Sequence, residues 1–411
     1  AAMLDSLAPQ TDAYRALQRE LLRWLKADDN DWPAIETSRD HMERGESGAD
    51  VRALRARLVQ LGWLRPFTPV SELPDNLFTL EGLTAAPDFD APLEAALQAA
   101  QRSARLSPDG VAGPETLAWL NRTPSDRIDT LRANLERHRW LPDDLGDVHI
   151  VANVPDFTLQ VVVSGRTVRR HDVIVGRVSR PTPTLTAYMA YMIINPWWET
   201  PHSLAVRDEL PLFRRDPGAV SRLGFQVLDR DGNVVDASTI DWATVSASSF
   251  PYRLRQAPGP LNALGVVKFI FPNPHSTFLH DTPGRQRFDE IPRALSSGCV
   301  RVRDAQELAE WIERFTVVEE DRPPIAELIA SGHERRIEFA ADIRVHFLYF
   351  TAFPEGTSSV RTVRDLYDKD HRIIEALGVR DETAEIPARR PDVDHSHASQ
   401  PGVGYGGGCP G

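Results

Sequence analysis

The sequence predicts a multidomain α+β protein in which an all-helical N-terminal region precedes a mostly β region. Its 411 residues are enough for two or three domains of roughly 150 residues each. Apolar residues recur at helical spacing through residues 6–140, and β-branched runs separated by turn residues follow from His149 onward. These patterns place the change from helices to strands between Trp140 and His149.

Composition disfavours several classes of protein. The 47 Lys and Arg against 59 Asp and Glu give a net charge of −12, which is unsuited to nonspecific nucleic-acid binding. The two cysteines, Cys299 and Cys409, rule out a disulfide framework and any multi-cysteine metal site. No apolar run reaches the ~18–20 residues that span a bilayer. The N-terminus shows no signal peptide, so we expect either a cytosolic protein or a mature or trimmed chain.

Five helices are expected in the N-terminal region. The first covers 6–27, and the others begin after Gly48, at Pro92, at Pro114 and at Arg127. Proline in a first turn and glycine after a last turn are common helix boundaries. Residues 65–90 are Pro-rich and weakly patterned, so no element is assigned there.

The β region is expected to open with a hairpin over 149–163 that turns at Pro155-Asp156. A second hairpin is expected over 225–235, turning on Asp231-Gly232. Further strand-like runs and one helix follow the same patterns: strands at 173–176, 190–194, 266–271, 277–279 and 344–350, and a helix at 304–315.

Five divisions of the chain follow from these patterns. They are an N-terminal helical scaffold segment (1–45), a helical domain (46–122), a linker helix (123–145), a β-rich domain (146–380) with an inserted cap at about 203–250, and a disordered Gly-rich tail (381–411).

The residues with the clearest chemical meaning are His280 and Cys299. A cysteine nucleophile must be a thiolate, which requires a nearby base or cation, and histidine is the usual base. Gly298 allows the backbone to turn directly before the sulfur. The alternative is that Cys299 is a small buried apolar residue, as many single cysteines are.

The stretch Ser296-Ser297-Gly298-Cys299-Val300-Arg301, together with His280-Asp281-Thr282-Pro283, resembles the active-site motif of the L,D-transpeptidase (YkuD-type) catalytic domain, and more closely its large YcbB-like branch. Ser297 stands where the family usually has a second histidine. Segments beginning at Asn195, Asp208, Gly259 and Asp365 resemble the same branch, so the resemblance covers roughly 125–380.

The helical domain at 46–122 resembles a peptidoglycan-binding module. Residues 51–64 look like its first half, and Asp109-Gly110-Val111-Ala112-Gly113-Pro114-Glu115-Thr116 looks like its second. The insertion at about 65–90 departs from the short form of this module.

This resemblance implies an enzyme that needs no metal or cofactor and forms 3→3 cross-links between peptidoglycan stem peptides. Cys299 would attack the donor stem and form a thioester, and His280 would move the proton. A backbone carbonyl would orient His280. The amides of Gly298 and Cys299 would stabilise the oxyanion, with Ser297 supporting this turn. The family also suggests that carbapenems acylate the cysteine.

Two residues beside this pair have open roles. Asp281 follows His280 on a strand, so its side chain is expected on the other face. Arg301 is expected on the same side as Cys299. Its functional role would be to support the site or bind a substrate carboxylate, and the alternative is a structural ion pair. Ser296, three residues before Cys299, is expected to support the site.

Four further residues are candidates or alternatives. Trp198 could line the stem groove or form part of the cap core, and Tyr252 and Asn262 flank the return from the cap. His275 is interpreted as a loop residue rather than the base. The cap itself could be a lid or a fixed addition.

The tail holds Asp392, Asp394, His395 and His397, which we interpret as solvated polar sequence rather than a metal site, and Cys409, interpreted as a free thiol. From the resemblance we expect the periplasm of a diderm bacterium. Expected partners are peptidoglycan and, further, glycan synthases and penicillin-binding proteins, with no nucleic acid and no membrane span.

Two other functions stay open. The same nucleophile with water as acceptor would give an L,D-carboxypeptidase that trims tetrapeptides, and a non-catalytic peptidoglycan-binding protein would only dock stems. A papain-like protease is disfavoured because its cysteine precedes its histidine in the chain, the reverse of the order here.

Overall fold

The computed structural model describes residues 8–27, 29–64, 86–142, 144–316, 322–356 and 359–378. The chain forms two compact units, which we name the N-terminal unit and the sheet unit. The N-terminal unit contains the described residues within 1–144, 290–292 and 349–380, and the sheet unit contains those within 145–289 and 293–348. Most of the insertion at 65–90 and the whole tail, with His395, His397 and Cys409, lie outside the described residues.

The expected helices of the N-terminal unit are present. Three of them begin with side-chain caps: Thr11 accepts from the Tyr14 amide, Asp90 accepts from the Leu93 amide, and Thr123 and Asp126 form a capping box. The helices and strands of this unit are α2 (Asp12–Trp24), η1 (Asp29–Asp31), α3 (Ala49–Gln60), α5 (Ala91–Ala104), α6 (Pro114–Leu120), α7 (Pro124–Arg139), β16 (Ala352–Glu355), β17 (Ser359–Thr362) and α13 (Asp370–Ala376).

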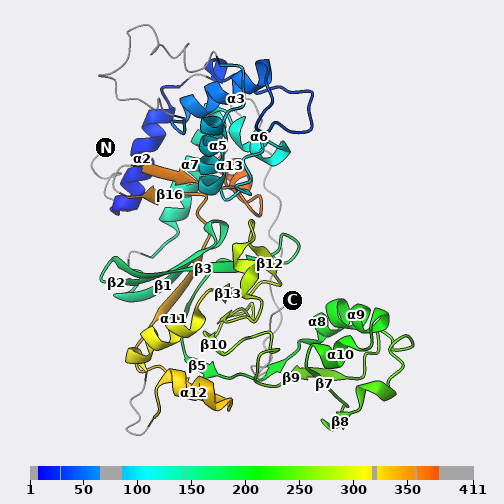
Figure 1. The fold of residues 1–411 in the computed structure, drawn as a ribbon. Helices are drawn as coiled ribbons and strands as arrows, with labels where there is room; N and C mark the ends of the chain where they lie inside the picture. The colour runs from blue at the N-terminus through cyan, green and yellow to red at the C-terminus, as the bar shows by residue number, and fades with distance from the viewer. Residues whose placement is uncertain are drawn as a thin grey trace, which may run out of the picture. The chain divides into compact units, whose positions relative to one another are not determined.

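The C-terminal segment belongs to the N-terminal unit, which differs from the sequence-based assignment of 146–380 to one β-rich domain. The reason is its polar packing on α7. Asn134 is fully buried and exchanges hydrogen bonds with Thr351, and Arg137 Nη1 lies 2.6 Å from Asp370 Oδ1. Figure 1 shows α13 and β16 beside α7. Local patterning along 349–378 gives no sign of this distant partner.

The sheet unit is organised by an 11-stranded mixed sheet. Its order is β14-β5-β10-β11-β13-β3-β2-β1-β15-β4, and β12 pairs with β3. The strands are β1 (Val148–Asn153), β2 (Thr158–Val163), β3 (Arg166–Gly176), β4 (Leu185–Tyr188), β5 (Tyr191–Ile194), β10 (Val267–Ile270), β11 (Leu279–His280), β12 (Ala294–Ser296), β13 (Val300–Val302), β14 (Arg335–Glu338) and β15 (Arg344–Leu348).

The first expected hairpin is confirmed, because β1 and β2 are antiparallel with Asn153 opposite Thr158. Two helices pack together and against the sheet, α11 on β10 and α12 on β5. The helical segments of this part are η3 (Val154–Asp156), η6 (Arg285–Asp289), α11 (Ala305–Ile312), η7 (Glu313–Phe315) and α12 (Ile325–Ser331).

The cap is a small subdomain inserted between β5 and β10 and drawn in green in Figure 1. Its four-stranded sheet has the order β6-β9-β7-β8, and the β7–β8 pair confirms the second expected hairpin. Phe213 packs edge-on against Phe225 and Trp242 at its centre. The elements are β6 (Trp198–Glu199), α8 (His202–Leu204), the π-helix η4 (Ala205–Glu209), α9 (Leu210–Arg215), α10 (Ala219–Arg222), β7 (Phe225–Leu228), β8 (Val234–Val235), η5 (Ala237–Thr239) and β9 (Arg253–Gln256).

Neither a membrane-spanning helix nor a metal-binding cluster is present among the described residues. Among the described residues, no helix is long and apolar enough to cross a membrane. Within the same part of the chain, no three His, Cys, Asp or Glu side chains are grouped so as to hold a metal ion.

Candidate active site

Two short parallel strands bring His280 and Cys299 into the same part of the sheet. β11 pairs with β13, with Leu279 opposite Val300 and His280 opposite Arg301. Cys299 directly precedes β13, and its Sγ accepts a hydrogen bond from the Phe278 amide at 3.4 Å. The structure thus brings together the residues that the sequence analysis predicted as base and nucleophile.

The imidazole of His280 lies in a row between two cationic residues. Lys268 on β10 is paired with His280, and His280 is paired with Arg301 on β13. Directly paired residues project from the same face of a sheet. The sequence analysis did not single out Lys268, although a lone lysine within the apolar run 266–271 is a pattern that could have indicated it.

His280 is held in one tautomer by a backbone carbonyl. Its Nδ1 lies 2.5 Å from the carbonyl oxygen of Asp281. A carbonyl can only accept, so Nδ1 carries the proton and Nε2 keeps its lone pair. Nε2 is buried and has no hydrogen-bond partner among the residues that the structure describes. The ring is therefore arranged to accept a proton at Nε2.

Burial and the two neighbouring cations keep this imidazole neutral. Desolvation, and after it the positive charge of Arg301, lowers the pKa of His280 to about 3, with a smaller contribution from Lys268. Burial also lowers the pKa of Lys268, whereas the charge of Glu334 and that of Cys299 in its thiolate form oppose that shift. The ammonium of Lys268 therefore interacts with both members of the candidate pair.

A set of hydrogen bonds fixes the turn before Cys299. Gly298 has a φ of +118°, a conformation that favours glycine. Ser296 Oγ accepts from the Gly298 amide at 3.1 Å and donates to the Cys299 carbonyl at 2.5 Å. Thr182 Oγ1 donates to the Gly298 carbonyl at 2.9 Å. The predicted support by Ser296 thus takes the form of holding both ends of this turn.

The Gly298 amide has an acceptor inside the protein, which the sequence analysis did not anticipate. Gly298 was expected to donate to a substrate oxyanion, but here its amide donates to Ser296. To act as an oxyanion donor, this amide must exchange Ser296 Oγ for the substrate oxygen.

Ser297 connects the nucleophile turn to the cap. Its Oγ accepts from Arg180 Nη1 at 2.8 Å. The same guanidinium binds the Asp208 carboxylate through contacts of 2.5 and 2.8 Å, and this hydrogen bonding lowers the pKa of Asp208. Asp208 lies in η4 of the cap. Sequence reasoning missed Arg180, because nothing in the run around Pro181 indicates a distant partner.

The Asp281 side chain stabilises the backbone rather than facing the imidazole. Its Oδ2 accepts from the Val266 amide at 3.0 Å and lies 3.8 Å from Arg285. Gly265 has a φ of +63°, and a Cβ there would come within 2.3 Å of this oxygen. Burial raises the pKa of Asp281. The residue contributes to the candidate site through its carbonyl.

The structure shows how three residues that were expected near the substrate site are packed. Trp198 is 2% exposed and packs against Phe225, and Tyr252 packs against Trp242 and Phe250. Asn262 is 1% exposed, and its amide nitrogen donates to the carbonyls of Pro196, Gln256 and Ala257. These side chains build the cap and its return to the sheet. His275 is an exposed loop residue, as predicted.

Two family models match parts of this chain. Residues 147–319 match the family model described as "L,D-transpeptidase catalytic domain" (YkuD), and residues 47–120 match one described as "Putative peptidoglycan binding domain". The chain carries an L,D-transpeptidase catalytic domain of the YkuD family. It also carries a peptidoglycan-binding domain in its helical region.

One curated relative is a "Putative L,D-transpeptidase" of Haemophilus influenzae, 36% identical over 249 residues. The match covers 61% of this chain and 50% of the relative, so the chain spans half the length of that protein. The expected α+β fold, with a helical peptidoglycan-binding region and a mostly β YkuD-type domain, is confirmed.

Two solved L,D-transpeptidase structures are also similar. The structure from Xylanimonas cellulosilytica has 17% identity, a TM-score of 0.24 and coverage of 76% of this chain and 100% of its own. The one from Stackebrandtia nassauensis has 12% identity, a TM-score of 0.25 and coverage of 77% and 96%. At these TM-scores neither likeness carries an argument about the site.

The neutral His280 predicts a loss of stability in acid. An unfolded histidine titrates near 6.5, but His280 stays neutral down to a pKa of about 3. Between these values the unfolded chain binds the extra proton, so stability falls with falling pH by up to about 1.4 kcal/mol per unit and is fully present above pH 6.5. His280→Gln should make the slope shallower in urea unfolding. His275→Gln is the control for substitution of an exposed histidine, and equal slopes for His280→Gln and wild type would contradict this account.

The charge of Lys268 is predicted to favour the thiolate of Cys299. Lys268→Met should slow iodoacetamide labelling of Cys299 by roughly 3- to 10-fold near neutral pH, because a nearby cation stabilises the thiolate. Labelling is followed by mass spectrometry with Cys409 as the internal reference thiol. Lys268→Arg keeps the charge and should label at nearly the wild-type rate, and equal slowing in both variants would assign Lys268 a packing role instead.

Proposed function

We propose that this chain is an L,D-transpeptidase that forms 3→3 cross-links between peptidoglycan stem peptides through a thioester on Cys299. The observation that carries the mechanism is the hydrogen bond from His280 Nδ1 to the Asp281 carbonyl, which leaves Nε2 as the base. The peptidoglycan-binding domain in the same chain supports peptidoglycan as the substrate.

The proposed reaction has two acyl transfers. Cys299 Sγ attacks the carbonyl between the diamino acid and the terminal D-alanine of a tetrapeptide donor, and Nε2 of His280 takes the thiol proton. The C–N bond then breaks, the departing D-alanine receives that proton, and a thioester remains. The side-chain amine of a second stem attacks the thioester, gives its proton to Nε2, and forms the new amide while the thiol is restored.

Lys268 and Arg301, the two cations that flank His280, act on the charges that the proposed first step creates. The thiolate that forms in the first step develops beside Lys268, whose charge already interacts with Cys299. The same cations disfavour a long-lived imidazolium, so the proton on Nε2 passes readily to the leaving group. A weakly basic imidazole thus acts as a relay for protons.

Substrate entry requires a movement of the protein. Cys299 and His280 are both fully buried in this structure. The bonds of Arg180 to Ser297 and to Asp208 connect the nucleophile turn with the cap. We infer that the donor stem reaches Sγ when groups covering this turn move aside. The proposed compartment is the periplasm, where this substrate lies.

The products formed from purified disaccharide-tetrapeptide test the proposal. Wild type should give a cross-linked dimer that has lost one D-alanine, detected by mass spectrometry. It should also give a transient protein adduct on the peptide that contains Cys299. Cys299→Ala should form neither, and His280→Gln should slow both by roughly 100-fold or more, as expected for loss of a general base.

The same experiment separates the alternatives. Tripeptide monomer without dimer would identify an L,D-carboxypeptidase, because water would then be the acceptor. Dimer formation that persists in Cys299→Ala would overturn the assignment of the nucleophile. An exposed substitution in the cap, Asp231→Asn, serves as the control and should leave product formation unchanged.

A further inference from the structure

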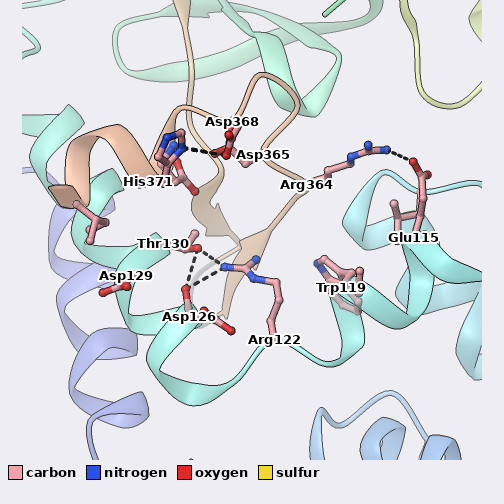
Figure 2. A pocket seen from close by; sticks show the side chains of 14 residues that line it. Glu115, Trp119, Arg122, Asp126, Asp129, Thr130, Arg364, Asp365, Asp368 and His371 are labelled. Atoms are coloured by element: carbon pink, nitrogen blue, oxygen red, sulfur yellow. Dashed lines mark hydrogen bonds and ion pairs between the residues drawn. The ribbon is translucent and has the colours of Figure 1, made fainter. Parts of the chain in front are cut away.

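The N-terminal unit contains a polar pocket of about 430 Å³ that has no part in the proposed chemistry. Its walls come from α6, from α7 and from the segment 364–374, as Figure 2 shows. The family match at 47–120 includes only part of this lining, since α7 and the C-terminal segment lie beyond it. The pocket therefore depends on segments that are far apart in the sequence.

One buried hydrogen-bond donor of this pocket lacks an acceptor among the described residues. Trp119 is 8% exposed, and its indole Nε1 has no hydrogen-bond partner among the described residues. Figure 2 shows the nitrogen-bearing edge of its ring turned toward the side of the pocket where Arg122 lies. A buried N–H without an acceptor destabilises a protein, so a ligand that supplied an oxygen here would be favoured.

Arg122 offers further donors beside Trp119. Its Nη2 donates to the Asp126 carbonyl at 3.0 Å and to Thr130 Oγ1. Within the described part of the chain its Nε and Nη1 make no hydrogen bond, although the charges of Asp370, Asp126, Asp365 and Asp129 act on the guanidinium. A guanidinium with two open N–H groups matches the two oxygens of a carboxylate.

The rest of the wall is acidic, which restricts the ligand. The described lining holds six carboxylates against the guanidiniums of Arg122 and Arg364 and one imidazole. Most carboxylates have partners in the protein: Asp365 accepts from Tyr349 and from two amides, and Asp370 binds Arg137. A phosphate or other polyanion would be repelled by this wall.

Asp368 is the acidic group best placed to take a positive charge. Its side chain is 83% exposed, and Oδ1 lies 3.0 Å from His371 Nδ1. Its Oδ2 has no hydrogen-bond partner among the residues described. In Figure 2 Asp368 lies across the pocket from Arg122. The pocket thus presents donors for a carboxylate on one side and an acceptor for an ammonium on the other.

We propose that this pocket binds the zwitterionic head of an amino acid, with its carboxylate at Arg122 and Trp119 and its ammonium at Asp368. Free D-alanine carries this group, and so does the side-chain end of a diamino acid in a peptidoglycan stem. The latter source rests on the proposed function. The volume is ample for a single amino acid with part of a chain attached.

Calorimetric titration of the full chain carrying Cys299→Ala, which cannot turn over substrate by the proposed mechanism, tests the pocket. The probes are D-alanine and the disaccharide-tetrapeptide, with N-acetyl-D-alanine and D-alanine amide as ligands that each lack one charge. At least one zwitterionic probe should bind saturably, and the blocked ligands should not. Which probe binds identifies the source of the zwitterion.

Two substitutions assign the binding to this pocket. Trp119→Phe removes the N–H and keeps the ring, and Asp368→Asn removes an exposed charge. Each should weaken binding roughly 10-fold. The exposed substitution Asp231→Asn in the cap should leave affinity unchanged. Product formation by the chain with Cys299 intact is measured separately, so failure of this proposal is distinguishable from failure of the catalytic one.

The proposal is overturned by absence of saturable binding of both zwitterionic probes. It is also overturned if Trp119→Phe and Asp368→Asn bind as tightly as the unsubstituted pocket. Binding of N-acetylglucosamine in place of the amino-acid probes, with the same sensitivity to Trp119→Phe, would show that the pocket selects a neutral sugar.

Discussion

The candidate site depends on the parallel pairing of β11 with β13. This pairing sets His280 opposite Arg301, while the antiparallel pairing with β10 sets Lys268 on its other side. Because directly paired residues share a face, the sheet alone places a neutral base between two cations. The turn at Gly298 then brings the sulfur of Cys299 to the Phe278 amide.

In the proposed mechanism the imidazole and the cations beside it have different roles: His280 accepts the proton, and Lys268 stabilises the thiolate. Burial together with Arg301 keeps His280 neutral, and the Asp281 carbonyl decides which nitrogen carries the proton. A neutral imidazole can accept the thiol proton, whereas the thiolate is stabilised by a lysine on the neighbouring strand. The carboxylate of Asp281 stabilises the backbone at Gly265 and Val266 instead, so no carboxylate is needed to orient the base.

Much of the fold could be predicted from the sequence, because helix caps, proline positions and β-branched runs act locally. The two hairpins and the helices at Pro92 and Pro114 illustrate this. Long-range placement could not be predicted in the same way. The packing of Thr351 on Asn134, the link from Arg180 to Ser297, and the position of Lys268 beside His280 join residues whose surrounding patterns show no trace of their partners. Cys299 and His280 were identifiable because their motif lies within one short stretch, whereas Trp198 and Asn262 have polar or aromatic character that suits a core as well as a groove.

The central claim is that His280 is a neutral base with its proton on Nδ1. Nitrogen-15 NMR of the histidine-labelled chain, with the His280 signals assigned by comparison with His280→Gln, tests it most directly. At neutral and mildly acidic pH the account predicts a protonated Nδ1 and a Nε2 shift typical of an unprotonated ring nitrogen. An imidazolium, or a ring protonated on Nε2, would contradict it.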